Sequence, residues 1–243
     1  MEPIAANLSA IRARIDAASA ASGRAPGSVR LLPVSKTRPL PDLQAAIEAG
    51  CTRFGENKAQ ELEARSFALA DVPGLEWVMI GHLQSNKAKL VARYASEFQA
   101  LDSVPLAAEL DRRLQPLGRR LDVLIQVNSS GEESKFGLPP DEVVAFAREL
   151  TTFDALRVRG LMTLALPSAV KPQVAACFAR MQLVQQLLRE AGIAGQSYNE
   201  LSMGMSGDFE LAIAHGATQV RIGTGIFGAR DYGPNDDRDG DQE

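Results

Sequence analysis

The sequence predicts an α/β fold, a single (β/α)8 TIM barrel with an additional N-terminal helix. Short, mostly apolar segments typical of buried parallel strands alternate eight times with segments of helical periodicity. Strands that alternate with helices pair in parallel through right-handed crossovers. Eight such units in about 220 residues match a closed barrel better than an open doubly wound sheet.

The first element is expected to be a helix that precedes the barrel. Apolar residues recur at positions i, i+4, i+7 and i+11, which are Ile4, Leu8, Ile11 and Ile15. This spacing predicts a helix over residues 3–21, and Gly23 ends it. The segment alternates apolar and charged residues and lacks the apolar centre of a signal peptide, so we expect a cytoplasmic protein.

The remaining elements follow from apolar runs and from the residues that punctuate them. The predicted strands span residues 30–36, 51–56, 75–81, 97–103, 122–130, 157–165, 199–204 and 218–223. The predicted helices span residues 40–49, 58–69, 83–93, 105–117, 140–152, about 174–188, and 207–215. Pro39 and Pro41 lead into the first of these helices and Gly50 closes it, while Pro105 and Pro140 start later ones.

Composition and charge exclude several classes of function. The 243 residues carry a formal net charge of -4, so no basic face is expected for nucleic acid or an anionic membrane. No apolar run approaches the roughly 20 residues of a membrane span. Cys51 and Cys177 lie far apart without metal-ligand spacing and are predicted to be reduced, buried thiols, and two scattered histidines do not suggest a metal site. We expect one domain over residues 1–230 and an acidic, disordered tail at residues 231–243.

Lys36 is the first candidate for chemistry. The apolar run LLPV at residues 31–34 ends in Ser35-Lys36-Thr37, as when a buried parallel strand opens into a loop. An amine at such a strand end is partly desolvated, which favours its neutral form, and a neutral amine condenses with an aldehyde or ketone to a Schiff base. The alternative is a surface lysine whose stem covers apolar residues while its ammonium group is in water.

The functional site of a (β/α)8 barrel lies at the C-terminal ends of its strands, and polar residues of this chain gather there. They are Lys36, Glu56, Asn57, His82, Ser129, Ser130, Thr163, Ser206 and Thr224. Each by itself could be an ordinary loop residue. Together they are expected to line one rim.

A glycine-containing turn after the seventh strand is a candidate phosphate site. In LSMGMSGDFE, Gly204 and Gly207 flank Ser206 just before a predicted helix, where free backbone N–H groups would face an anion. This interpretation requires Asp208 and Glu210 to point outward. The alternative is that Ser206 is an ordinary N-cap of the helix.

A second such turn follows the eighth strand. In VRIGTGIFG, Thr224 lies between two glycines, in one of the loops that most often bind phosphate in this fold. Strand alternation directs Arg221 and Gly223 the same way, so Arg221 is expected to point into the barrel mouth. A buried arginine stays charged and needs an acceptor. This acceptor is either an internal carboxylate such as Glu56 or Glu200, or an acceptor on a ligand.

With these motifs, the sequence resembles the pyridoxal phosphate homeostasis protein family (YggS/PROSC type), which looks like the barrel domain of alanine racemase standing alone. The matching segments are VSKTRP at 34–39, RFGENKAQEL at 53–62, WVMIGHLQSNKAK at 77–89, VLIQVNSSGEESKFGL at 123–138, GLMTL at 160–164, LSMGMSGDFELAIAHG at 201–216 and VRIGTGIFGAR at 220–230. The resemblance covers residues 5–230. The sequence departs from the family pattern at Val78, Phe136 and Gly207.

The resemblance implies that the protein binds pyridoxal 5′-phosphate (PLP). The implied cofactor-binding residues are Lys36, which forms the covalent aldimine, and Asn57, His82, Ser202, Met203, Ser206, Gly207, Arg221, Gly223 and Thr224. Ser206, Gly207, Gly223 and Thr224 would hold the phosphate, and Arg221 would lie near the pyridine nitrogen. Asn57 would lie near the polar edge of the ring, and the other residues would line the pocket.

The implied function is to hold or deliver PLP and so to maintain intracellular vitamin B6 and amino-acid and keto-acid pools, as a monomer, with PLP-dependent apoenzymes as recipients. An arginine cannot accept a proton, so it disfavours the protonated ring nitrogen on which the electron sink of PLP depends. Racemases add a tyrosine from an extra domain. The tyrosines of this chain are Tyr94, Tyr198 and Tyr232, of which Tyr94 lies in a predicted helix and Tyr232 in the tail, neither with a motif around it, and packing or surface roles are expected for them. We therefore expect no catalytic residue and no enzyme, with a weak PLP-dependent amino-acid racemase or a lysine-dependent aldolase as alternatives.

Overall fold

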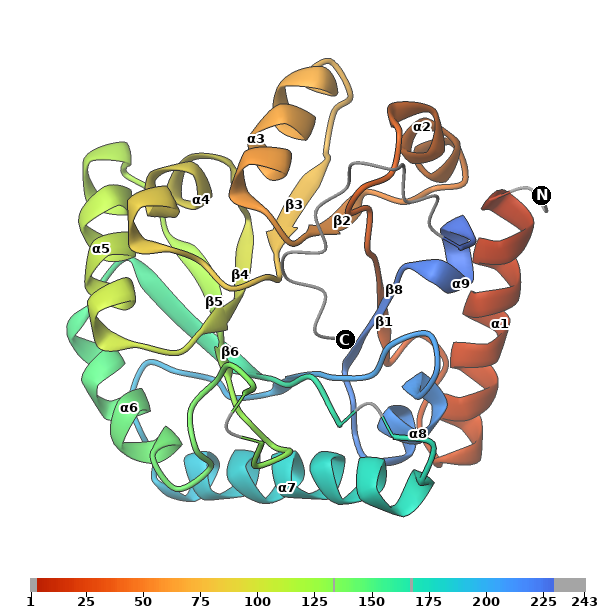
Figure 1. The fold of residues 1–243 in the computed structure, drawn as a ribbon. Helices are drawn as coiled ribbons and strands as arrows, with labels where there is room; N and C mark the ends of the chain where they lie inside the picture. The colour runs from red at the N-terminus through yellow and green to blue at the C-terminus, as the bar shows by residue number, and fades with distance from the viewer. Residues whose placement is uncertain (1–3, 133, 167, 230–243) are drawn as a thin grey trace.

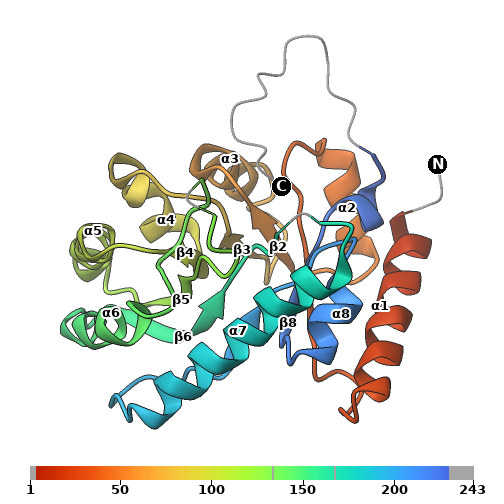
Figure 2. The ribbon, with the colours of Figure 1, turned by 60° about the horizontal axis from the view of Figure 1, so that its bottom comes forward.

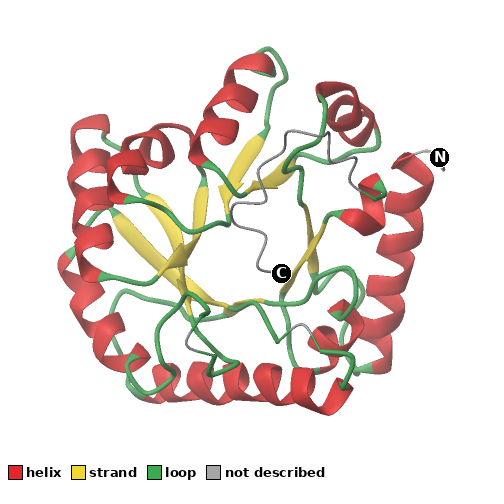
Figure 3. Cartoon of the chain, viewed as in Figure 1, coloured by secondary structure: helices red, strands yellow, loops and turns green. Residues whose placement is uncertain are grey.

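The strands of the computed structural model form an inner ring, and the helices surround it (Figures 1 and 3). The structure describes residues 4–132, 134–166 and 168–229, so the tail at residues 231–243 lies outside the described residues and its domain boundary stays a prediction. The strands are β1 (Arg30–Pro33), β2 (Arg53–Glu56), β3 (Glu76–Met79), β4 (Glu97–Leu101), β5 (Leu121–Gln126), β6 (Leu156–Met162), β7 (Glu200–Ser202) and β8 (Gln219–Ile222). Each lies within or next to a predicted strand.

The barrel is nearly closed and entirely parallel, which confirms the predicted fold class. The order of the strands is β1-β8-β7-β6-β5-β4-β3-β2. Between β1 and β2 the ring is completed by a bridge from Val34 to Gly55, where the Ser35 N–H also donates to the Gly55 carbonyl at 3.0 Å. Since all strands run the same way, the loops that follow them lie at one end of the barrel.

The helices lie outside this ring. They are α1 (Ile4–Ala21), α2 (Leu40–Glu48), α3 (Ala59–Ala68), α4 (Ala88–Tyr94), α5 (Val104–Leu114), α6 (Val143–Glu149), α7 (Lys171–Glu190), α8 (Phe209–Ala214) and α9 (Thr224–Phe227). None of those described is both long and apolar enough to cross a membrane. The sequence did not predict α9, because four residues are too few to show helical periodicity.

The predicted additional helix, α1, packs beside α8 and α9 (Figure 2). The Asn7 side chain donates to the Ile226 carbonyl at 2.9 Å, and Arg14 pairs with Glu210 with an Nε–Oε1 distance of 2.8 Å. This helix therefore supports the loops that follow β7 and β8 from outside the barrel.

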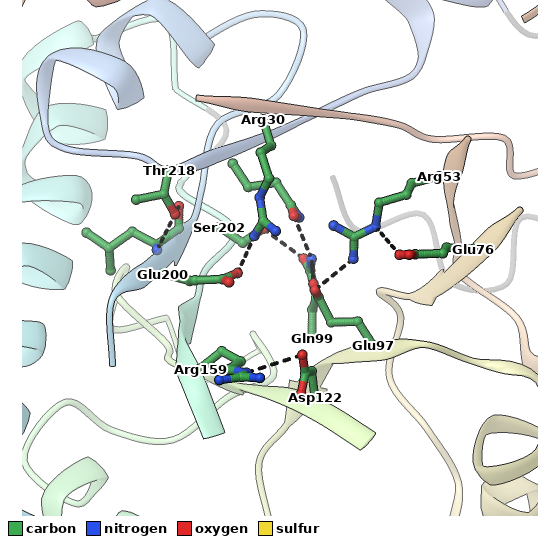
Figure 4. A network of polar contacts seen from close by, with 12 residues as sticks. Arg30, Arg53, Glu76, Glu97, Gln99, Asp122, Arg159, Glu200, Ser202 and Thr218 are labelled. Carbon is green, nitrogen blue, oxygen red and sulfur yellow. Dashed lines mark hydrogen bonds and ion pairs between the residues drawn. The ribbon is translucent and has the colours of Figure 1, made fainter. Parts of the chain in front are cut away.

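Charged and amide side chains fill part of the barrel interior (Figure 4). Arg30 pairs with Glu200, the first residue of β7, and Arg53 pairs with both Glu76 at 2.8 Å and Glu97 at 2.9 Å. Arg30 and Glu76 are about half exposed, whereas the Glu97 side chain is only 5% exposed and has Arg53 as its partner, as a buried carboxylate requires. The polar interior thus provides a fixed floor below the open end of the barrel.

Candidate functional site

The first and last strands are neighbours, which brings the Lys36 loop beside the loop that follows β8. The Val34 N–H donates to the Ile222 carbonyl at 2.9 Å, and a Cβ on Gly223 would lie 3.4 Å from the Val34 oxygen. The Arg38 guanidinium donates to the Phe227 carbonyl at 3.0 Å and to the two carbonyls that follow it. Two segments nearly 190 residues apart along the chain are therefore held together at the functional end of the barrel.

Lys36 lies half-buried in the loop that begins after β1. The next residue, Thr37, has a φ of 61°, in the left-handed region that β-branched residues rarely adopt. Such a conformation persists only where surrounding contacts hold it. Contacts with neighbouring residues, rather than the intrinsic backbone preference of Thr37, therefore fix the conformation of the loop at Lys36.

The two predicted anion turns also come together. The Thr224 hydroxyl donates to Ser206 Oγ at 3.1 Å, and the Gly225 N–H donates to the same oxygen at 3.3 Å. Thr224 and Gly207 are exposed, and a Cβ built on Gly207 meets no atom within 4 Å, so the space beside them is open. Hydroxyls and backbone amides around an open space are the groups that hold a phosphate in other proteins.

The alternative that Ser206 merely caps α8 is wrong. The helix begins at Phe209, two residues later than predicted, and its N-cap residue is Asp208. With only six residues α8 has a small dipole, so the loop groups must supply most of any anion affinity. The phosphate interpretation required Asp208 and Glu210 to point outward. Glu210 does so, and its carboxylate accepts a hydrogen bond from Arg14.

Asp208 does not meet that requirement, because it turns back into its own loop. Its carboxylate accepts the Met205 N–H at 2.6 Å. Burial raises the pKa of Asp208, while the Met205 hydrogen bond and the Arg221 charge oppose that rise. The Asp208 carboxylate therefore interacts with its own loop and with the positive charge of Arg221 rather than pointing outward.

Arg221 points into the barrel, as strand alternation predicted, and only 3% of it is exposed. One terminal nitrogen donates to Ser202 Oγ at 2.7 Å and the other to the Thr163 carbonyl at 2.8 Å. Burial lowers the pKa of Arg221 to about 10, with Asp208 opposing the change, so the guanidinium stays cationic at neutral pH. The predicted ion pair with Glu56 or Glu200 is wrong, since Glu200 pairs with Arg30 and Glu56 faces α3.

A chain of hydrogen bonds anchors Arg221 to the barrel floor. Ser202 Oγ donates to Gln99 Oε1 at 2.7 Å, and Gln99 Nε2 donates to Glu97 at 2.5 Å, which in turn accepts from Arg53 (Figure 4). Sequence reasoning missed Gln99. A fully buried amide in the predicted strand EFQALDS was the signal that could have found it.

The other predicted site residues are dispersed around the rim. Met203 is buried beside Ser202, and Asn57 is half-buried, with its carbonyl 2.2 Å from where a Cβ on Gly81 would lie. His82 is exposed and stacks on Phe136 at 4.2 Å between ring centroids, so it belongs to the β3 and β5 loops rather than to the two anion turns. The hydroxyls of Ser129 and Thr163 are buried and form a hydrogen bond of 2.8 Å with each other.

The chain is thus a (β/α)8 barrel with a lysine after β1, two adjoining glycine-containing turns after β7 and β8 and a buried arginine on β8. The family described as "Alanine racemase, N-terminal domain" matches residues 6–231. A pyridoxal phosphate homeostasis protein of Pseudomonas aeruginosa is 43% identical over 96% of this chain and 98% of its own. The Escherichia coli K12 protein of the same name is 41% identical over 96% and 99%. The chain belongs to the pyridoxal phosphate homeostasis protein family.

Solved structures agree with this assignment. PipY of Synechococcus elongatus with PLP bound has a TM-score of 0.82 and 35% identity, over 93% of this chain and all of that one. An alanine racemase of Clostridium difficile has a TM-score of 0.71 at 15% identity, over 96% of this chain and 58% of that one, which shows the fold alone.

Proposed function

We propose that this protein binds PLP through a Schiff base with Lys36 and holds or delivers it to maintain vitamin B6 and amino-acid and keto-acid pools. The observation that carries the proposal is the open space beside Ser206 and Thr224, next to the loop of Lys36. The structure of PipY, which has PLP bound, supports the same ligand. Bound PLP would supply an electron sink for groups attached to its aldehyde carbon.

Within this site, each residue has a distinct task. Lys36 would form the covalent link, and Ser206, Gly207, Gly223 and Thr224 would hold the phosphate. Arg221 would face the ring nitrogen, and Asn57, His82, Ser202 and Met203 would line the pocket. Because Arg221 remains a cation, it would disfavour a proton on that nitrogen and weaken the electron sink.

A role without catalysis is supported by the positions of the tyrosines. Tyr94 ends α4 and packs on Phe67, and Tyr198 is 2% exposed and precedes β7, so both lie toward the strand-start end of the barrel, away from the site. Burial raises the pKa of Tyr198 to about 12, which makes it a poor proton carrier at neutral pH. Tyr232 lies outside the described residues. We also propose that the protein is a cytoplasmic monomer that passes PLP to apoenzymes.

The proposal is tested by intact-mass measurement after loading with PLP and reduction with borohydride, followed by peptide mapping. We expect one reduced adduct, on Lys36. An adduct on another lysine, or none after loading, would refute the proposal.

The racemase alternative has a separate test. The PLP-loaded protein is incubated with L-alanine or L-serine in heavy water. We expect neither deuterium at Cα nor the D-isomer to accumulate stoichiometrically over the time in which a racemase would reach equilibrium. Stoichiometric turnover would favour the enzyme.

Ser206→Ala should weaken binding of PLP about ten- to hundredfold, because a hydrogen bond to a charged group contributes about 1.5–3 kcal/mol. Binding of pyridoxal, which has no phosphate, should not change. Equilibrium dialysis with both ligands measures the difference. Ser130→Ala is the matched control, because its hydroxyl donates within its own loop to Asn128 at 3.0 Å. Equal loss of affinity for both ligands would show that Ser206 does not contact the phosphate.

A further inference from the structure

Glu56 is a fully buried carboxyl group directly behind the Lys36 loop. It is the last residue of β2 and has no exposed surface. Arg53 and Gly55 face the barrel interior, where Arg53 pairs with Glu97 and a Cβ on Gly55 would meet Leu32. Strand alternation therefore turns Glu56 outward toward α3. The sequence analysis predicted that Glu56 lines the rim, and this prediction is wrong because its side chain points toward α3.

Glu56 and Glu61 of α3 hold the residues on both sides of Lys36. The Ser35 hydroxyl donates to Glu56 Oε1 at 2.6 Å. The Thr37 N–H donates to Glu61 Oε2 at 3.4 Å, which holds a residue whose backbone is in the strained left-handed region. The two carboxyl groups thus contact the loop immediately before and immediately after the lysine.

The second carboxylate oxygen of Glu56 lies in surroundings that favour the protonated form of the group. Its second oxygen, Oε2, is buried and faces no hydrogen-bond donor among the described residues. Glu61 is near enough for its charge to raise the pKa of Glu56, and its carboxylate accepts the Thr37 N–H two residues along the loop from the Ser35 hydroxyl that Glu56 accepts. Two carboxyl groups can form a hydrogen bond with each other only if a proton lies between them. A protonated Oε2 would serve as that donor, so protonation satisfies the buried atom and the neighbouring carboxylate together.

We propose that Glu56 and Glu61 share one proton and, through it, fix the backbone on both sides of Lys36 in the conformation that presents its amine to the cofactor. This inference rests on the proposed role of Lys36 and adds two positioning residues to it. Arg65 completes the arrangement from the same helix, since it lies 3.9 Å from Glu56 and donates to the Arg38 carbonyl.

Burial and the neighbouring charges set the pH range in which the Glu56–Glu61 pair loses its shared proton. Burial is the largest cause that raises the pKa of Glu56 to about 8, followed by the charge and hydrogen bond of Glu61, while Ser35 and Arg65 oppose it. Between pH 4.5 and about pH 8 the folded protein keeps a proton that the unfolded chain has lost. The free energy of unfolding therefore falls as the pH rises through this range. Above it, two adjacent carboxylates repel each other and release the loop.

The test is amide hydrogen exchange of residues 34–38 in the full chain without PLP, corrected for the intrinsic effect of pH. In the unmodified protein we expect protection of Thr37 to fall about tenfold between about pH 7 and pH 9. Glu56→Gln, whose amide can donate to Glu61 without titrating, should keep protection at both values. Glu63→Gln changes a glutamate of the same helix that contacts neither Ser35 nor Thr37 in the hydrogen bonds described above, and it should behave like the unmodified protein.

A second measurement separates this inference from the proposed function. Borohydride trapping of PLP on Lys36 is followed over the same pH range in each variant. In the unmodified protein and in Glu63→Gln, the yield of trapped PLP should change with pH in the same way. In Glu56→Gln, the part of this change that comes from the shared proton should be absent. If Lys36 is trapped normally but Glu56→Gln leaves the exchange profile unchanged, the shared proton is refuted and the proposed function stands. If no variant is trapped while the exchange profiles differ as expected, the proposed function fails instead.

Discussion

Lys36→Ala is expected to lower the covalent incorporation of PLP at least about a hundredfold. The reason is that a Schiff base needs a primary amine at the aldehyde, and the loop contacts hold this one at the site. Borohydride reduction and intact mass measure the loss. Lys58→Ala is the matched control, because Lys58 is an exposed lysine that follows the neighbouring strand β2.

Reversible binding should survive this substitution in part. The hydroxyls of Ser206 and Thr224 and the guanidinium of Arg221 remain in place, so equilibrium dialysis should still detect PLP at reduced affinity. An undiminished adduct in Lys36→Ala would place the reactive amine elsewhere. A loss of adduct in Lys58→Ala as well would show that the trapping is not specific to the site.

Gly160→Ala is expected to lower the free energy of unfolding by about 3 kcal/mol or more. A Cβ at this position would lie 1.9 Å from the Glu200 carbonyl oxygen, which is backbone of the paired strand β7. The strands cannot separate without breaking the ladder between β6 and β7. The added methyl group therefore distorts the wall that carries Ser202.

Urea unfolding monitored by circular dichroism measures this effect as a lower midpoint. Gly207→Ala is the control, because a Cβ there meets no atom within 4 Å. Its free energy of unfolding should change by less than about 0.5 kcal/mol. Similar midpoints for the two variants would mean that β7 moves away more easily than the close approach indicates.

Much of the fold could be predicted because it depends on local patterns. Helical spacing of Ile4, Leu8, Ile11 and Ile15 predicted α1, and the apolar runs located all eight strands. The periodic signal fails in short elements. Helix α9 has only four residues, and α8 begins later than its pattern suggested, because the Met205–Asp208 turn takes up its first residues.

The sequence by itself determined which residue types stand at the ends of the strands, and alternation determined that Arg221 points inward. Only the tertiary structure decided what those side chains contact. The partners of Arg221 come from β7 and from the residue that follows β6, and Gln99 reaches Ser202 across the barrel. Glu56 lies one residue before Asn57, yet the pleat turns it toward α3 and away from the open end. The physical reason is that a hydrogen-bond partner is set by barrel closure and strand register, which join residues far apart along the chain.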